Sequence, residues 1–199
     1  EGFPVVCIDR EIPDLKVDQV FSDNHSGAYK ATQHLIDQGH RDIGIILELT
    51  DISSFSHRLE GYKKALRDNN IKVRDAYIRT SGLEIEGAYE STGSLLEQEP
   101  KISALFSTND LITEGVLRYF KENKTKCPEE IALVGFDDPE WANSFNPSIT
   151  SVAQQPYEMG YQAATLLFEQ LEAKKDKRKP RRIVLDTELR VRESSVVKK

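Results

Sequence analysis

The sequence predicts an α/β fold built from doubly wound parallel sheets. Short apolar runs rich in β-branched residues alternate with amphipathic stretches of helical periodicity along the chain. The apolar runs lack strict alternation of apolar and polar residues, which is typical of parallel strands covered on both faces by helices. With 199 residues, 38% of them hydrophobic, the chain is long enough to bury a core in one large domain or two small ones.

The expected elements of the first half follow in a regular order. Strands are expected at residues 4–9, 17–23, 42–47, 76–80 and 102–107, and helices at residues 25–40, 57–70 and 85–98. Gly39 fits the left-handed position that ends a helix, so the first helix is expected to end there.

The second half continues this order and then changes character. A helix is expected at residues 110–124, strands at 131–136 and within 146–156, a long helix at 157–175, and one or two strands within 181–194. The long helix is expected to pack through one apolar face, made of Met159, Ala163, Leu166, Leu167 and Leu171. A helix added after a finished sheet suggests that the chain crosses into a second lobe.

Composition limits the classes of partner and compartment. The net charge of −6 argues against direct binding of nucleic acid, which needs a concentrated basic surface. The basic stretch at residues 174–182 is interpreted as a solvated linker. Cys7 and Cys127 show no metal-ligand spacing, which favours free thiols in a reducing cytoplasm. No apolar run approaches the length that spans a bilayer, so no membrane partner is expected.

The start of the chain also carries information. It has no initial methionine and no signal-like segment, and it enters a strand pattern at once. We therefore expect that a preceding portion of the protein is missing.

Polar residues follow every expected strand, and this is where a ligand site is predicted. Ligands of open doubly wound sheets bind outside the carboxyl ends of the strands. Arg58, Asn109 and Asp137 lie after three such strands and supply a forked donor, a mixed donor–acceptor and an acceptor. This set suits a small polyhydroxylated or heterocyclic ligand.

Each of these polar residues also has a simpler structural interpretation. Asp110 and Asp138 are expected to cap the helices that follow them, with Pro139 at a first helical position. Asn109 is open to a role in an Asx-turn, and Arg58 to an exposed position at the start of a helix. For Asp137 a turn and a ligand acceptor are equally good interpretations.

Enzymatic signatures are absent from the sequence. It contains no G-x-G-x-x-G, phosphate-loop or G-x-S-x-G motif. None of the four histidines belongs to an H-E-x-x-H pair, and no other metal-ligand spacing occurs. We therefore expect no metal, no cofactor and no catalytic activity.

Several motifs in a fixed order resemble one known family. They are "FSDNHSGAYKATQHLIDQGHRDIGII", "RLEGYKKAL", "ALFSTNDLITEGVL", "CPEEIALVGFDDPEW", "NPSITSVAQQPYEMGYQAATLL" and "ELRVRES". The chain resembles, over nearly its whole length, the effector-binding portion of LacI/GalR-type bacterial transcriptional regulators, which share the periplasmic-binding-protein-like fold.

The resemblance implies two lobes joined by three crossovers. Residues 1–22 and 151–180 are expected in an N-terminal lobe, and residues 23–150 and 181–199 in a C-terminal lobe. It further implies that the first lobe is incomplete and that the helix-turn-helix domain is absent from this chain.

The resemblance also assigns roles to individual residues. The implied effector contacts are Arg58, Asn109, Asp137, Asp9, Arg10, Leu83 and Ser54. Asp9 and Arg10 are expected to face the cleft from the first lobe. Leu83 stands where the family often places an aromatic ring, so the identity of the ligand stays open.

The function implied is ligand sensing. A small, sugar-like effector is expected to stabilise one closure angle of the lobes and so alter operator DNA binding by the absent domain of a cytoplasmic homodimer. Residues 111–120 and 143–150 are expected at the dimer surface. Two alternatives remain: a periplasmic-type sugar-binding protein for transport, and a doubly wound enzyme such as a sugar kinase or isomerase.

Overall fold

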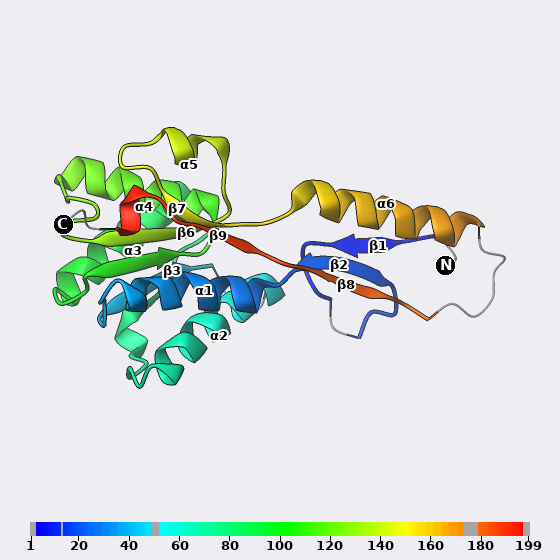
Figure 1. Ribbon diagram of the computed structural model, residues 1–199, viewed down its shortest axis with the longest axis horizontal. Coiled ribbons are helices and arrows are strands. Elements are labelled where there is room, and N and C mark those ends of the chain that lie inside the picture. The colour runs from blue at the N-terminus through cyan, green and yellow to red at the C-terminus, as the bar shows by residue number, and fades with distance from the viewer. Residues whose placement is uncertain (1–2, 13, 49–51, 173–178, 197–199) are drawn as a thin grey trace.

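The computed structural model describes residues 3–12, 14–48, 52–172 and 179–196. The molecule is elongated, with a small lobe and a large lobe joined end to end (Figure 1). The small lobe has a three-stranded sheet in the order β1-β2-β8, and the large lobe a six-stranded sheet in the order β4-β3-β5-β6-β7-β9. Only the pairing of β7 with β9 is antiparallel among the described strands. The α/β, parallel-sheet prediction is therefore confirmed.

The small lobe consists of few elements. They are β1 (Val6–Ile8), β2 (Asp18–Ser22), β8 (Arg182–Leu185) and the helix α6 (Pro156–Glu172). The helix α6 lies along one face of the sheet and packs against all three strands (Figure 1). Val20, Met159 and Leu166 form the centre of this core.

The large lobe contains most of the regular structure. Its strands are β3 (Ile43–Leu47), β4 (Ile78–Thr80), β5 (Ala104–Ser107), β6 (Ala132–Phe136), β7 (Thr150–Ala153) and β9 (Glu188–Arg190). Its helices are α1 (Asn24–Asp37), α2 (Ser53–Asp68), α3 (Ile85–Gln98), α4 (Asp110–Asn123) and α5 (Glu140–Ser144), with 3-10 turns at Asp75–Tyr77 and Glu193–Ser195.

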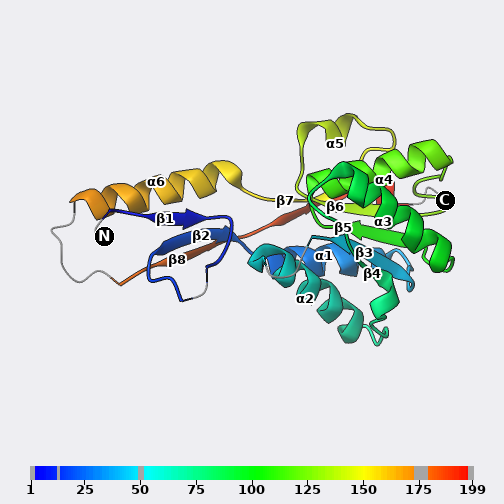
Figure 2. The ribbon, with the colours of Figure 1, turned by 180° about the vertical axis from the view of Figure 1, so that it is seen from behind.

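Two helical layers sandwich the large sheet. Figure 2 shows α1 and α2 packed together on one face and α3 and α4 on the other. Ile45 belongs to the core beneath α1 and α2, whereas Ile46 belongs to the core beneath α3 and α4. Both residues are fully buried, which explains why the apolar runs do not alternate with polar residues.

The end of α1 follows the expected glycine signal. Gly39 has a φ of +99°, and its N–H donates to the carbonyl of Ile36 at 2.9 Å. The next N–H, of His40, reaches back to the carbonyl of Leu35 at 3.1 Å. This pair of bonds is the Schellman pattern, which satisfies carbonyls that the helix leaves unpaired.

Strand pairing corrects two of the expected lobe boundaries. β7 pairs with β6, so residues 151–153 lie in the large lobe rather than in the first lobe. β8 pairs with β2, so residues 182–185 lie in the small lobe rather than in the C-terminal one. The chain therefore enters the small lobe after β7 and leaves it only after β8.

Two further expectations about helices are wrong. α2 begins at Ser53, four residues earlier than residue 57. In α6, Leu167 and Leu171 are 36% and 61% exposed, because a helix that covers only three strands buries a narrower face. The expected linker at residues 174–182 falls partly outside the described residues.

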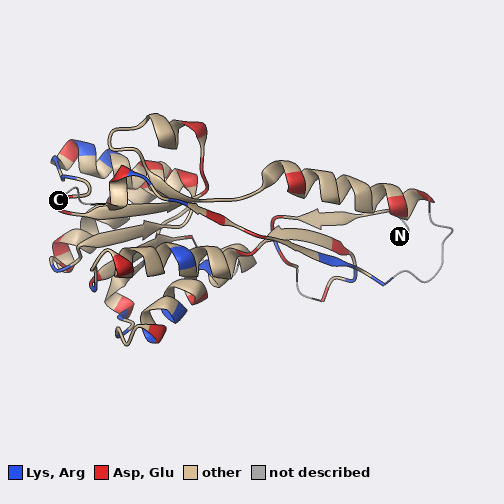
Figure 3. Cartoon of the chain, in the orientation of Figure 1, with Lys and Arg blue, Asp and Glu red and all other residues tan. Residues whose placement is uncertain are grey.

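Three short connections, which lie beside one another, join the two lobes. They run from β2 to α1, from β7 to α6 and from β8 to β9. The N–H of Asp23 donates to the carbonyl of Leu185 at 2.8 Å, and Nε2 of Gln155 donates to the carbonyl of Asp186 at 2.8 Å. Figure 3 shows acidic residues on the connections from β2 to α1 and from β8 to β9. In the part of the chain that the structure describes, no helix combines the length and apolar character needed to cross a membrane.

Candidate functional site

A cavity of about 500 Å³ lies between the lobes at the carboxyl ends of β1, β6 and β7. Asp9 and Met159 reach it from the small lobe, and Asp137 from the large lobe. Its other lining residues are Asp110, Asp138, Pro139, Ala153, Gln154, Pro156 and Arg190. The position outside the carboxyl ends of parallel strands is the one expected for a ligand.

Asp9 and Asp137 have matching backbone conformations on opposite sides of this cavity. Each directly follows the last residue of a strand, and their φ angles are +70° and +72°. Positive φ is uncommon outside glycine, but aspartate tolerates it better than bulkier residues. Non-glycine residues in this conformation cluster at ligand and active sites. The two carboxylates therefore mark the cleft from both lobes.

Arg58 is buried rather than exposed, so the simpler interpretation of this residue is wrong. The residue is only 3% exposed, because it lies on the buried face of α2. Nε donates to Oδ1 of Asn24 at 2.8 Å, Nη1 donates to the carbonyl of Thr108, and the guanidinium carbon lies 3.7 Å from the centre of the Phe136 ring. These contacts hold the cation between the ends of β5 and β6.

Nearby carboxylates balance the charge of Arg58 without forming a direct ion pair with it. Burial lowers the pKa of its guanidinium, and the nearby carboxylates of Asp137, Asp9 and Asp110 oppose that effect. No ion pair within 4.0 Å joins Arg58 to an acid among the described residues. Part of the guanidinium donor capacity is thus left for a group brought by a ligand.

Asn109, and not Asp110, caps α4. Oδ1 of Asn109 accepts from the N–H of Ile112 at 2.7 Å. Asn109 has the extended backbone that a capping residue requires, with φ −160° and ψ 179°, whereas Asp110 is already the first helical residue. The prediction for Asp110 is therefore wrong by one position. Asn109 is 6% exposed, and its Nδ2 makes no hydrogen bond with any described residue.

Asp138 does not cap a helix either. Arg192 forms a fork on its carboxylate at 2.7 and 3.1 Å, and Arg190 and Ser151 add bonds at 2.6 and 2.5 Å. Burial alone would raise the pKa of Asp138, but these hydrogen bonds together lower it to about 2. Pro139 occupies the capping position of α5 without a side-chain bond. Asp138 therefore ties the end of β6 to the C-terminal segment.

Asp137 keeps acceptor capacity free. Gln154 donates its Nε2 to Oδ1 of Asp137, and no other side-chain bond to this carboxylate occurs among the described residues. Burial raises the pKa of Asp137, while Arg58 and the bond from Gln154 lower it. The geometry favours the acceptor interpretation over a simple turn residue.

Of the predicted site residues, Asp9 and Asp137 line the cavity, and its lining does not include Arg58, Asn109 or the other three. Arg10 forms a long ion pair of 3.8 Å with Asp9 and is half exposed. Leu83 is 40% exposed in the loop after β4 and does not line the cavity. Ser54 is buried one turn before Arg58, but the bond that crosses between the lobes is made by its neighbour, where Oγ of Ser53 accepts from the N–H of Glu11 at 2.8 Å.

Two buried residues at this edge of the sheet were not among the predicted site residues. Glu48 follows β3 and Ser81 follows β4, with exposed fractions of 7% and 5%. Within the part of the chain that the structure describes, Oε2 of Glu48 and Oγ of Ser81 have no hydrogen-bond partner. Their signal in the sequence is position alone, because Glu48 lies in the otherwise apolar run "IGIILEL" and Ser81 directly follows "AYIRT".

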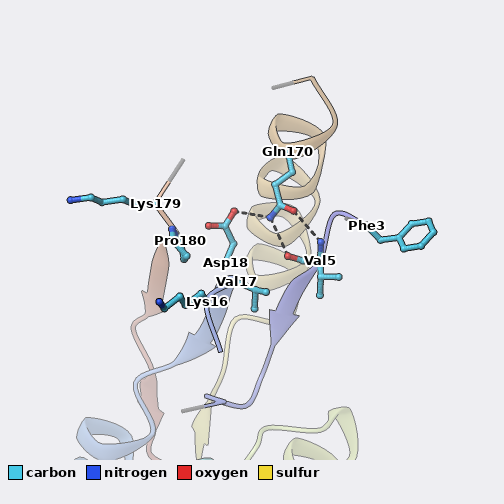
Figure 4. A pocket seen from close by; sticks show the side chains of 8 residues that line it. All are labelled: Phe3, Val5, Lys16, Val17, Asp18, Gln170, Lys179 and Pro180. Carbon is cyan, nitrogen blue, oxygen red and sulfur yellow. Dashed lines mark hydrogen bonds between the residues drawn. The ribbon is translucent and has the colours of Figure 1, made fainter. Parts of the chain in front are cut away.

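A second cavity, of about 250 Å³, lies at the far end of the small lobe (Figure 4). Two of its polar side chains, those of Asp18 and Gln170, are bonded to each other. The amide of Gln170 bonds both the N–H and the carbonyl of Val5, at 3.0 and 3.1 Å, and donates to Asp18 at 2.9 Å. These contacts tie the segment before β1 to α6.

No metal site accompanies the cleft within the described residues. Groups of three or more His, Cys, Asp or Glu placed to hold an ion do not occur there. Both cysteines are free thiols, and burial raises the pKa of Cys127 to about 12.

Two hinged lobes with a polar crevice between them define a periplasmic-binding-protein-like domain, and the chain belongs to that family. The family profile, described as a periplasmic binding protein-like domain, matches residues 32–195. Within this family the relatives are LacI-family transcriptional regulators, which confirms the resemblance predicted from the motifs.

Three relatives illustrate this similarity. The Paenibacillus polymyxa protein named "Probable HTH-type transcriptional regulator EndR" is 38% identical over 87% of this chain and 51% of its own length. The complex of the transcriptional regulator CelR with cellobiose has a TM-score of 0.88 and 32% identity, over 95% of this chain and 58% of the other. A sugar-binding LacI-family regulator from Escherichia coli, in complex with phosphate, has a TM-score of 0.84 and 26% identity, over 97% and 68%.

The chain thus spans only about half the length of the curated relatives it matches. The similarity covers the region of the two lobes.

Proposed function

We propose that this chain is the effector-sensing domain of a LacI-type transcriptional regulator and binds a small sugar or sugar derivative between its lobes. The observation that supports the proposal is that Arg58 contacts Thr108 and Phe136, the residues directly before Asn109 and Asp137, at one edge of the sheet. Carbohydrate hydroxyls, which both donate and accept, match such a set.

The lobes give this site a means of transmitting a signal. Asp9 belongs to the small lobe and Asp137 to the large one, and both line the same cavity. An effector bonded to both carboxylates binds the closed arrangement better than an open one, and that difference in affinity shifts the population toward closure. The closure in turn alters how a helix-turn-helix region elsewhere in the protein meets operator DNA in the cytoplasm. The relatives are regulators rather than enzymes, which supports sensing without turnover.

A homodimer is part of this proposal. A groove of about 460 Å³ separates α4 from α5 and is lined by Leu117, Trp141 and Phe145 together with charged residues. Phe145 is 41% exposed and packs edge-on to Trp141, with ring centres 6.3 Å apart. Paired copies match the two-fold symmetry of operators. Sedimentation of the wild type and of Phe145→Asp tests this, and equal masses at all concentrations contradict it.

The binding proposal is tested by calorimetry on the intact protein with a ligand panel. The panel contains ribose, glucose, maltose, cellobiose, glucose 6-phosphate and hypoxanthine. A true effector at a hundred times its dissociation constant should stabilise the fold by about 2.7 kcal/mol in a parallel thermal-shift measurement.

Variants then locate the binding. Arg58→Met keeps the aliphatic stem and removes the donors, so binding of the effector should be lost. Arg67→Met, at an exposed arginine of the same helix paired with Glu60 at 3.8 Å, is the matched control and should bind like the wild type. Unchanged affinity in Arg58→Met contradicts the assignment of the site.

A further inference from the structure

The buried polar atoms without a partner are concentrated at one kind of place. Within the described residues they are Oγ of Ser22, Oε2 of Glu48, Oγ of Ser81 and Oε1 of Gln154. Each lies in the last residue of a strand or directly after it, at the carboxyl ends of β2, β3, β4 and β7. Nearly all buried polar atoms of folded proteins are bonded, so unpaired ones call for an explanation. Their shared position indicates that these polar groups are available to bind a ligand.

Two of these atoms are neighbours on the large sheet. The N–H of Ser81 donates to the carbonyl of Leu47 at 2.8 Å, which places Ser81 beside the end of β3. Leu47 is also paired in register with Thr80. The residues that follow these two, Glu48 and Ser81, therefore stand side by side beyond the last rung of the β3–β4 ladder.

The same registers connect this pair to the proposed effector site. Ile46 of β3 is opposite Ser107 of β5, so Glu48 comes level with Asn109 two residues later. Ser107 is in turn opposite Gly135 of β6, which brings Asn109 level with Asp137. One polar row thus crosses the ends of β4, β3, β5 and β6. Three strand spacings make this row about 14 Å long, which exceeds a single sugar ring.

The charge along the row is predominantly acidic. Asp9, Asp110 and Asp137 surround one buried cation, Arg58, and Glu48 adds a further carboxylate. The cation that lines the cavity, Arg190, is already paired with Asp138 at 2.6 Å. Such a surface favours neutral ligands rich in hydroxyl donors and repels phosphate groups.

From these observations we propose that Glu48 and Ser81 form a second subsite of the cleft, which binds hydroxyl groups on the second ring of an unphosphorylated disaccharide. The inference rests on the proposed function, because the first ring occupies the site around Arg58 and Asp137. Glu48 accepts hydrogen bonds from the second ring, and the hydroxyl of Ser81 both accepts and donates. Glu48 is then the residue that selects a disaccharide over a single sugar.

The test uses calorimetry on the intact protein with glucose, maltose, cellobiose and glucose 6-phosphate. The wild type should bind one of the disaccharides at least about tenfold more tightly than glucose, since a hydrogen bond to a charged group contributes that much. Glu48→Met removes the acceptor at similar volume and should abolish this preference without weakening glucose. Glu48→Gln retains one acceptor oxygen and should lose less of the preference for the disaccharide over glucose. Ser81→Ala should also lose part of that preference.

Folding is controlled separately. Among the described residues Oε2 of Glu48 has no partner, so Glu48→Met should unfold at a temperature no lower than the wild type. Glu90→Gln, at an exposed position of α3, is the matched control. It should change neither the unfolding temperature nor the preference for the disaccharide.

The outcomes separate this inference from the proposed function. If Glu48→Met keeps the full disaccharide preference, the second subsite is wrong while the effector site stands. An equal loss for glucose and disaccharide makes Glu48 part of the first site and also overturns the second subsite. Tighter binding of glucose 6-phosphate than of every neutral sugar overturns the charge argument, and absence of binding by every sugar overturns both proposals.

Discussion

The guanidinium carbon of Arg58 lies 3.7 Å from the centre of the Phe136 ring, and Phe136 is the residue directly before Asp137. A cation over an aromatic face is stabilised by about 2 kcal/mol or more when both groups are buried. Arg58 is 3% exposed and Phe136 is fully buried. The last side chain of β6 therefore supports the cation that the proposed effector contacts, while the next one provides an acceptor.

Replacing this ring separates its support of Arg58 from ordinary packing. Phe136→Leu should lower the free energy of unfolding by about 1 to 2 kcal/mol more than Phe106→Leu, because only the first change removes a ring beneath the cation. Phe106 is an equally buried neighbour, with its ring centre 6.5 Å away. Urea unfolding measures the difference. Equal losses in the two variants would show that the ring merely fills space.

Asp137 should oppose stability while serving binding. Its pKa is raised by burial, so the folded state binds its proton more tightly than the unfolded state, and the ionised form costs stability at neutral pH. Asp137→Asn should therefore raise the melting temperature, by about 2 to 4 °C for each kcal/mol gained in the free energy of unfolding. The same change should remove effector binding. Asparagine tolerates the φ of +72° and keeps an acceptor for Gln154. A lower melting temperature in scanning calorimetry contradicts this prediction.

The hydrogen bonds of Arg190, Arg192 and Ser151 to Asp138 should make the free energy of unfolding depend on pH in the acid range. Its pKa is lowered from 3.8 to about 2 in the folded state, so its contribution is complete above the ordinary pKa and is lost as the pH falls from about 4 to 2. Asp138→Asn should cost about 1 to 2 kcal/mol at pH 6 and much less at pH 2, where about half of the wild-type carboxylate is protonated. Urea midpoints across this range test the prediction. Asp75→Asn, at an exposed carboxylate, provides the control and should show no such convergence.

Close approach of α1 and α2 depends on one glycine. A Cβ on Gly61 would lie 2.2 Å from the carbonyl oxygen of His25 and 3.0 Å from Cβ of Ala28. Gly61→Ala should therefore destabilise the fold by about 1 to 3 kcal/mol. Gly160→Ala in α6, where no atom lies within 4 Å, should instead stabilise by about 0.5 to 1 kcal/mol. Thermal unfolding distinguishes the two, and a stabilised Gly61→Ala would rule out the steric argument.

Most of the fold could be predicted because its signals are local. The helix expected at residues 85–98 coincides with α3, and Gly39 ends α1 in the expected left-handed conformation. Fully apolar runs such as that of β3 correctly indicated strands covered on both faces.

The incorrect predictions depend on contacts that the local sequence does not contain. Asn109 and Asp110 are both good capping residues, and the choice between them depends on where β5 stops. Asp138 is bound by Arg192, 54 residues further along the chain. The boundary between the lobes at β8 depends on its pairing with β2, across more than 150 residues.

The candidate site was only partly predictable for the same reason. Arg58, Asn109 and Asp137 stand out as polar residues after apolar runs. Glu48 shares that position, but its significance depends on an oxygen left without a partner, which only the tertiary structure reveals.

The three connections between the lobes run close together, held by the bonds of Asp23 and Gln155 to the segment after β8. Pivots that lie this close together favour rotation of the lobes about one shared axis, as the proposed closure requires. One interlobe separation, measured between a pair of spin labels at exposed positions such as Tyr161 and Glu90, then suffices to follow the whole movement.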